Sequence, residues 1–136
     1  MKKLLLGLML VLVFISSNAM AEWTYIDDSK SGGSGDFSMY LDMSTLRKEA
    51  NLIKIWQLND YKNEQSFSDS EKFFSTRAQM EFNCKAEEVR VRAIIWSKGN
   101  MGHGEVTNTY NQISDWRVVP PSSINDEILK IVCDKK

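Results

Sequence analysis

Residues 72–97, KFFSTRAQMEFNCKAEEVRVRAIIWS, contain two segments in which apolar and polar side chains alternate. Alternation with a period of two places successive side chains on opposite faces of a β-strand. Residues 72–84 and 88–97 are therefore predicted to be two antiparallel strands. We expect one face of the first strand to turn towards the core, namely the face formed by Phe74, Thr76, Ala78, Met80, Phe82 and Cys84.

The turn between these strands predicts their register. A turn at 85–88 pairs Phe82 with Val91 and, on the opposite face, Glu81 with Arg92. A tighter turn would centre on Lys-Ala, which lacks the Asn-Gly chemistry of two-residue hairpins. Glu81 and Arg92 are then expected to form a solvent-exposed cross-strand ion pair, worth about 0.2–1 kcal/mol. The same register gives the pairs Cys84–Val89, Asn83–Arg90 and Arg77–Trp96.

The C-terminal segment predicts a short amphipathic helix. Pro120-Pro121 stops extended pairing, and Ser122 and Ser123 are candidate N-caps. Asp126 and Glu127 complement the positive end of the helix dipole. The apolar stripe consists of Ile124, Ile128, Ile131 and Val132.

Cys84 and Cys133 are the only two cysteines, and Cys133 follows that stripe directly. An exported chain with two cysteines permits one intrachain pairing, and no Cys-x-x-Cys motif suggests redox or metal chemistry. We therefore predict a structural disulfide between Cys84 and Cys133 that ties the helix to the sheet.

The remaining segments complete an α+β fold. Further strands are predicted at 22–26, 37–41, 52–58 and 105–110, whereas 29–35, 44–50 and 59–70 are predicted to be loops or turns. Together these strands form an antiparallel sheet of about six strands, with the C-terminal helix packed on one face.

The N-terminus predicts export. Lys2 and Lys3 precede an apolar run from Leu4 to Ile15, and Ala19-Met20-Ala21 is a small-x-small cleavage site. Residues 1–21 are interpreted as a signal peptide and 22–136 as one domain. No cysteine lies directly after the apolar run, where a lipoprotein anchor would be attached, so a lipid anchor is not expected. The mature chain is placed in the periplasm, at the cell surface or secreted.

Composition argues against several functions. Without the two lysines of the leader, 15 Lys and Arg stand against 18 Asp and Glu, a net charge of −3, which is unlike a nucleic-acid-binding protein. His103 is the only histidine and lies in a glycine-rich turn at 99–104. No nucleophile–base arrangement or metal-ligand spacing is present, so we predict no catalytic residue, cofactor or metal, and no enzymatic activity.

One surface has the composition of a protein-binding site. The predicted alternation places Arg90, Arg92, Ile94 and Trp96 on the face opposite the core. Aromatic residues and arginine are enriched where proteins bind each other. Burial of Trp96 by loops or by sheet curvature is the alternative.

Several motifs resemble the surface-adhesin protein E family of Gram-negative bacteria. They are Trp56-x-Leu58-x-Asp60-Tyr61, Glu81-Phe82-Asn83-Cys84-Lys85, Arg92, Trp116, Pro120-Pro121-Ser122-Ser123 and Val132-Cys133. The resemblance implies a curled antiparallel sheet with a C-terminal helix fastened by a disulfide, Cys84–Cys133. It also implies non-enzymatic binding of host extracellular-matrix proteins at the cell surface, and it allows for a homodimer. The alternative is a soluble periplasmic module that binds a small ligand or an envelope component in the concavity of the sheet.

Overall fold

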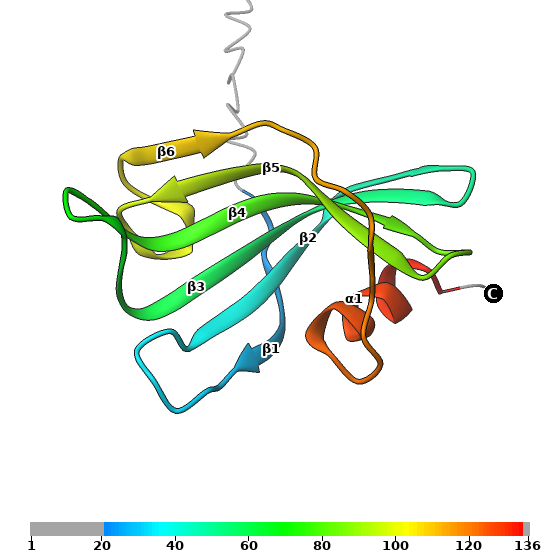
Figure 1. The fold of residues 1–136 in the computed structure, drawn as a ribbon, viewed down its shortest axis with the longest axis horizontal. Coiled ribbons are helices and arrows are strands. Elements are labelled where there is room, and N and C mark those ends of the chain that lie inside the picture. Colours follow the sequence, from blue (N-terminus) through cyan, green and yellow to red (C-terminus); the bar gives the residue numbers. More distant parts are fainter. Residues whose placement is uncertain (1–20, 135–136) are drawn as a thin grey trace, which may run out of the picture.

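The computed structural model describes residues 21–134, so all of the predicted signal peptide except Ala21 lies outside the described residues. Its main element is an antiparallel sheet whose six main strands follow one another in chain order, from β1 to β6 (Figure 1). The strands are β1 (Thr24–Ser29), β2 (Phe37–Glu49), β3 (Leu52–Ser68), β4 (Glu71–Asn83), β5 (Glu88–Ser97) and β6 (Val106–Tyr110). A two-residue strand, β7 (Arg117–Val118), also pairs with β5, and a 3-10 turn, η1 (Asn100–Gly102), follows β5. The helix α1 (Ile124–Val132) ends the described chain. The predicted fold class is confirmed.

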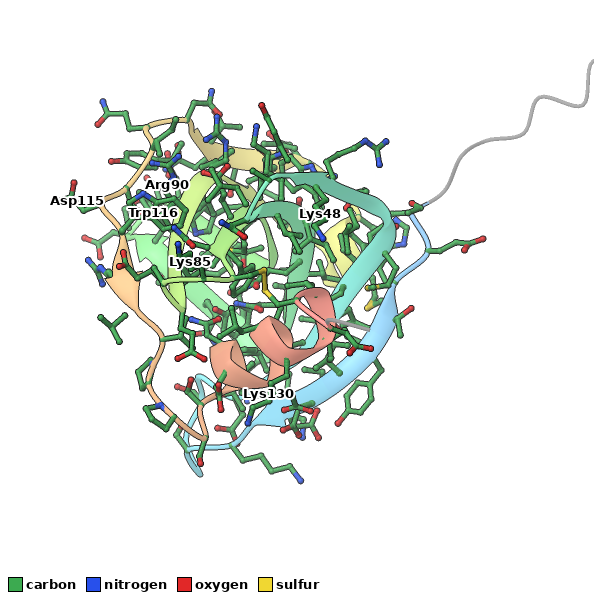
Figure 2. The ribbon with its side chains drawn as sticks, turned by 90° about the vertical axis from the view of Figure 1, so that its right-hand side faces the viewer. Lys48, Lys85, Arg90, Asp115, Trp116 and Lys130 are labelled. Carbon is green, nitrogen blue, oxygen red and sulfur yellow. A yellow bond between two sulfur atoms is a disulfide. The ribbon has the colours of Figure 1, made fainter. Side chains whose placement is uncertain are left out.

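The sheet bends because its strand pairs are interrupted repeatedly. Register shifts occur in every pair from β1·β2 to β5·β6. An extra residue in one strand bends that strand and increases its twist. The sheet therefore curls around α1, which lies against one of its faces (Figures 1 and 2). We call this the helix face and the opposite one the outer face.

The core lies between α1 and the helix face. Ile128, Leu129 and Val132 from the helix are buried, and Phe82 in the sheet has no exposed surface. They pack in one cluster with Met39, Leu41, Ile53, Ile55, Ala78, Met80 and Val89. The apolar alternation predicted for β4 from Ala78 to Phe82 is thus confirmed, because these residues line the core.

The helix is held at both ends. The Ser123 side chain accepts a hydrogen bond from the Asp126 backbone N–H at 3.1 Å, which confirms one predicted N-cap. At the other end, Cys133 forms the predicted disulfide with Cys84, with 5.6 Å between the two Cα atoms. A nine-residue helix is marginal on its own in water. Its packing and this crosslink therefore keep it in place.

Two predicted loops are strands. Residues 59–70 were expected to be a loop, but β3 continues to Ser68 and forms a long hairpin with β4. Residues 44–50 were expected to be a turn, but β2 runs to Glu49. In both places the side chains are mostly polar, and backbone pairing with the neighbouring strand stabilises the extended conformation.

The predicted β4–β5 register is also wrong. Phe82 pairs with Val89, and Glu81 pairs with Arg90. The reason is that β4 ends at Asn83, whose side-chain oxygen accepts hydrogen bonds from the backbone N–H groups of Lys85 and Ala86. Such an Asx arrangement closes a turn and competes with further strand pairing.

Candidate functional site

The site begins at a bulge in β5. Met80 pairs with Val91, whereas the next residue back along β4, Gln79, pairs with Ala93, so Arg92 is the extra residue. The bulge resets the alternation of β5. Ile94 consequently pairs with Ala78 and packs against the core.

The four predicted patch residues therefore do not share one face. The prediction that Ile94 lies opposite the core is wrong, and Trp96 follows it to the helix face because it is two residues further along the strand. Trp96 is half-buried and packs edge-on against Phe67, with 5.1 Å between ring centroids. Arg90 and Arg92 instead bind Glu81, which alternates with Met80 and Phe82 and so lies on the outer face.

Glu81 is the centre of this arrangement. The prediction that it is a solvated surface charge is wrong, since only 2% of its side chain is exposed. Its Oε1 atom accepts hydrogen bonds from Arg90 Nε at 2.6 Å and from Arg92 Nη1 at 3.2 Å, and Arg90 Nη2 lies 2.6 Å away. The carboxylate therefore fixes two guanidinium groups side by side, each about a quarter exposed.

Trp116 extends the cluster. The Arg90 guanidinium carbon lies 4.2 Å from the centre of the Trp116 ring, the geometry of a cation–π contact. Ser114 anchors the chain near Trp116, because its backbone N–H donates to the Val91 carbonyl and its hydroxyl accepts from the Val91 N–H, both at 2.9 Å. We call Glu81, Arg90, Arg92 and Trp116 the arginine cluster. Arg90 and Trp116 lie together at the disulfide end of the molecule (Figure 2).

More cations continue across the sheet. Register pairs join Arg47 to Lys54, Lys54 to Glu81 and Glu81 to Arg90. Since adjacent strands lie about 4.8 Å apart, this row spans about 14 Å across the strands. A groove of about 130 Å³ runs beside it, lined by Arg47, Lys48, Glu49, Leu52, Lys54 and Glu81. We call Arg47, Lys54, Arg90 and Arg92 the basic row. It is positive although the mature chain is acidic overall.

Sequence reasoning missed Arg47, Lys54 and the position of Trp116. Arg47 and Lys54 come from two other strands, and only the register between strands brings them beside Glu81. Trp116 follows β6 in an irregular segment for which no periodicity exists. Its neighbour Arg117 pairs with Val89 and so returns this segment to β5, a long-range contact that no local pattern of the sequence indicates.

The remaining features of the described residues concern the histidine, possible metal ligands and possible membrane spans. His103 is exposed in the 99–104 turn, as predicted. Within residues 21–134, no group of three or more His, Cys, Asp or Glu side chains could hold a metal ion. In the same range, no helix is long and apolar enough to cross a membrane. The arrangement can bind an anionic partner through fixed guanidinium groups, and no residue around it offers a nucleophile paired with a base.

Comparisons with known proteins place the fold. The sequence profile of the family described as Surface-adhesin protein E matches residues 23–134. The selenomethionine form of Haemophilus influenzae protein E superposes with a TM-score of 0.62 at 13% identity, covering 81% of this chain and 85% of that chain. The crystal structure of protein E from non-typeable Haemophilus influenzae gives 0.60 at 12% identity, covering 85% and 86%. No curated protein sequence matches this chain.

Proposed function

The chain belongs to the surface-adhesin protein E family, and we propose that it is an exported, non-enzymatic module that binds host extracellular-matrix proteins. The family supports an adhesin role and a protein partner. Export is supported by the N-terminal sequence, with residues 1–21 as the cleaved leader and residues 22–136 as the binding domain. The domain acts at the cell surface or after release from it.

The observation that carries this proposal is the arginine cluster. Arginine and tryptophan are the residues most enriched in binding hot spots. Glu81 already holds Arg90 and Arg92 in place, so a partner that binds them orders fewer free side chains. The partner surface that fits is an acidic segment of a matrix protein, because carboxylates form paired hydrogen bonds with guanidinium groups. Ile94 and Trp96 lie on the helix face, so they are not part of this proposed binding surface.

Binding to a panel of immobilised extracellular-matrix proteins tests the proposal, using the protein purified after export. Arg92→Gln should weaken binding about tenfold, equivalent to about 1.4 kcal/mol, because it removes one of the two fixed cations. Lys72→Gln is the matched control, since it removes an exposed charge beyond the bulge at the far end of the β3–β4 hairpin. Binding by no matrix protein, or equal losses in both variants, would overturn the proposal.

Protease treatment of intact cells tests the location independently. A surface module should be digested while an internal marker protein survives. Complete protection would favour the second candidate, a periplasmic module that binds a small ligand or an envelope component. One observation favours that candidate: a groove of about 300 Å³ on the helix face, lined in part by Val89, Val91, Ile94 and Tyr110.

A further inference from the structure

We propose that a second site, a pocket on the outer face around Arg77, binds a carboxylate that carries an apolar group. The pocket has a volume of about 370 Å³ and is lined by Ala21, Trp23, Arg77, Met101, Gly102 and His103. Trp23, Arg77 and the 101–103 segment remain in the chain after the predicted cleavage behind Ala21. The proposal does not rest on matrix binding by the arginine cluster.

The floor of the pocket is a loop fixed by buried hydrogen bonds. Ser75, which has no exposed surface, donates from its hydroxyl to the Gly99 carbonyl at 2.6 Å and accepts from the Gly102 N–H at 2.9 Å. Asp60 accepts from the Met101 N–H at 2.8 Å. The loop is therefore held against β4 and β3 at both of its ends before any ligand arrives.

The backbone of this loop has an unusual conformation. Met101 has a φ of 56° and Gly102 a φ of 75°, so two successive residues adopt left-handed geometry. For a residue with a side chain, such geometry costs of order 1 kcal/mol and persists only where surrounding contacts enforce it. Its consequence is that Gly102 lies directly on the Arg77 side chain, where a Cβ atom would come within 3.0 Å of Arg77 Cδ.

Arg77 is the cation that lacks a partner here. It is half-buried on β4, yet among the described residues no carboxylate lies within ion-pair distance of it. Its Nε atom is buried under the loop and has no hydrogen-bond partner among the described residues. Arginine keeps its charge at every physiological pH, so partial burial without an anion is costly. Arg90 and Arg92, which are also only partly exposed, share Glu81 as their anionic partner.

The lining defines the chemistry of the ligand. The guanidinium group favours a carboxylate, which it can bind through two parallel hydrogen bonds. Trp23 and Met101 offer aromatic and thioether surfaces for an apolar group attached to that carboxylate. The volume lies at the lower end of the range for small-molecule sites, about 300–1,000 Å³. A free small carboxylic acid and the C-terminal carboxylate of a peptide both present this chemistry.

Titration of the ¹⁵N-labelled exported protein with phenylacetate tests the site. The Gly102 amide and Trp23 indole signals should shift, and phenylacetate should bind at least tenfold more tightly than phenylacetamide, which lacks the charge. Arg77→Gln should weaken phenylacetate binding at least tenfold, whereas Arg117→Gln, an exposed arginine on β7, should not. Two further ligands, a peptide with a free C-terminal phenylalanine and the same peptide amidated, distinguish the two sources of the carboxylate. Tighter binding of the free peptide than of phenylacetate would identify the ligand as a peptide C-terminus, and the reverse would identify it as a small acid.

Three results would overturn the proposal: absence of shifts up to the solubility limit of phenylacetate, equal binding of the amide, or unchanged binding by Arg77→Gln. Near-ultraviolet circular dichroism checks that Arg77→Gln keeps its tertiary structure. If that variant is misfolded, Arg77→Lys keeps the charge but loses the planar fork, and it should retain a smaller part of the binding. Matrix binding by the arginine cluster can fail without affecting these results, since that binding depends on Arg92.

Discussion

Glu81→Gln tests the arginine cluster most directly. The substitution keeps the shape of the side chain and removes the charge that faces Arg90 and Arg92. Glu81 is 2% exposed, and both arginine side chains are 24% exposed. Two positive charges would therefore remain close together on a partly desolvated surface with no anion between them.

The expected magnitude follows from this burial. Removing one partner of a fully buried ion pair costs about 3–5 kcal/mol, and a hydrogen bond to a charged group contributes about 1.5–3 kcal/mol. Because the arginines can turn partly into water, we expect a loss of about 2–3 kcal/mol in the free energy of unfolding. For a domain of this size the melting temperature should fall by about 8–12 °C, at about 4 °C per kcal/mol.

Urea denaturation of wild type, Glu81→Gln and Glu105→Gln measures the difference. Glu105 is the matched control because it also forms a carboxylate–cation pair, at 3.0 Å to Lys98, but both side chains are more than half exposed. Its substitution should change the free energy of unfolding by no more than about 0.5 kcal/mol. Equal effects of the two substitutions would refute the reasoning, because burial would then make no difference to the contribution of the pair.

Three further predictions concern the helix. Cys84→Ser with Cys133→Ser should lower the free energy of unfolding by about 4 kcal/mol, from the entropy of a chain crosslinked 49 residues apart, and a loss below about 1 kcal/mol in urea denaturation would contradict it. Ser123→Ala should cost about 1 kcal/mol by the same measurement, because it removes the N-cap, and no change would show that the cap contributes nothing. The backbone N–H of Ser122, and then Lys130, hold the pKa of Asp126 below its ordinary value of 3.8. A carboxyl whose pKa is lower in the folded than in the unfolded protein stabilises the fold at pH values above its unfolded-state pKa, and this contribution is lost as the pH falls. The difference in free energy of unfolding between wild type and Asp126→Asn should therefore shrink below pH 3.8 in a pH series. A difference that is constant with pH would contradict this.

The sequence predicted the helix and the disulfide because both depend on local or countable signals. Ser123 precedes an apolar stripe with helical spacing, and Cys84 and Cys133 have no other possible partner. The apolar face of β4 was equally clear, since Ala78, Met80 and Phe82 alternate with polar residues and all three lie in the core. These signals needed no knowledge of how strands pair.

The bulge at Arg92 could not be predicted in the same way. Ile94 and Ile95 are both apolar, so the alternation of β5 is compatible with either face beyond Ala93. Only the register with β4 shows that Arg92 is an extra residue and that Ile94 packs against the core. The error in assigning Ile94 and Trp96 to the arginine face follows from this one residue.

The burial of Glu81 also depends on long-range structure. In the sequence it alternates with Met80 and Phe82 like any polar residue on a half-exposed strand. Arg90 and Arg92 cover it because the bulge brings both to one carboxylate. The Ser114–Val91 hydrogen bonds hold the segment that leads to Trp116 against β5. Each of these contacts joins different strands or segments, which a single-strand pattern cannot report.

A buried carboxylate with two arginines is a poor way to stabilise a sheet. Apolar side chains of similar volume at such positions are often neutral or more stabilising, by about 1–4 kcal/mol, because no charge has to leave water. Removing the Glu81 charge alone destabilises the fold, yet stability does not explain why charged residues occupy these positions. What Glu81 provides, and an apolar residue cannot, is a fixed orientation of Arg90 and Arg92 beside Trp116. The two hydrogen bonds that make Glu81→Gln costly thus favour a binding role for the outer face over a purely structural one.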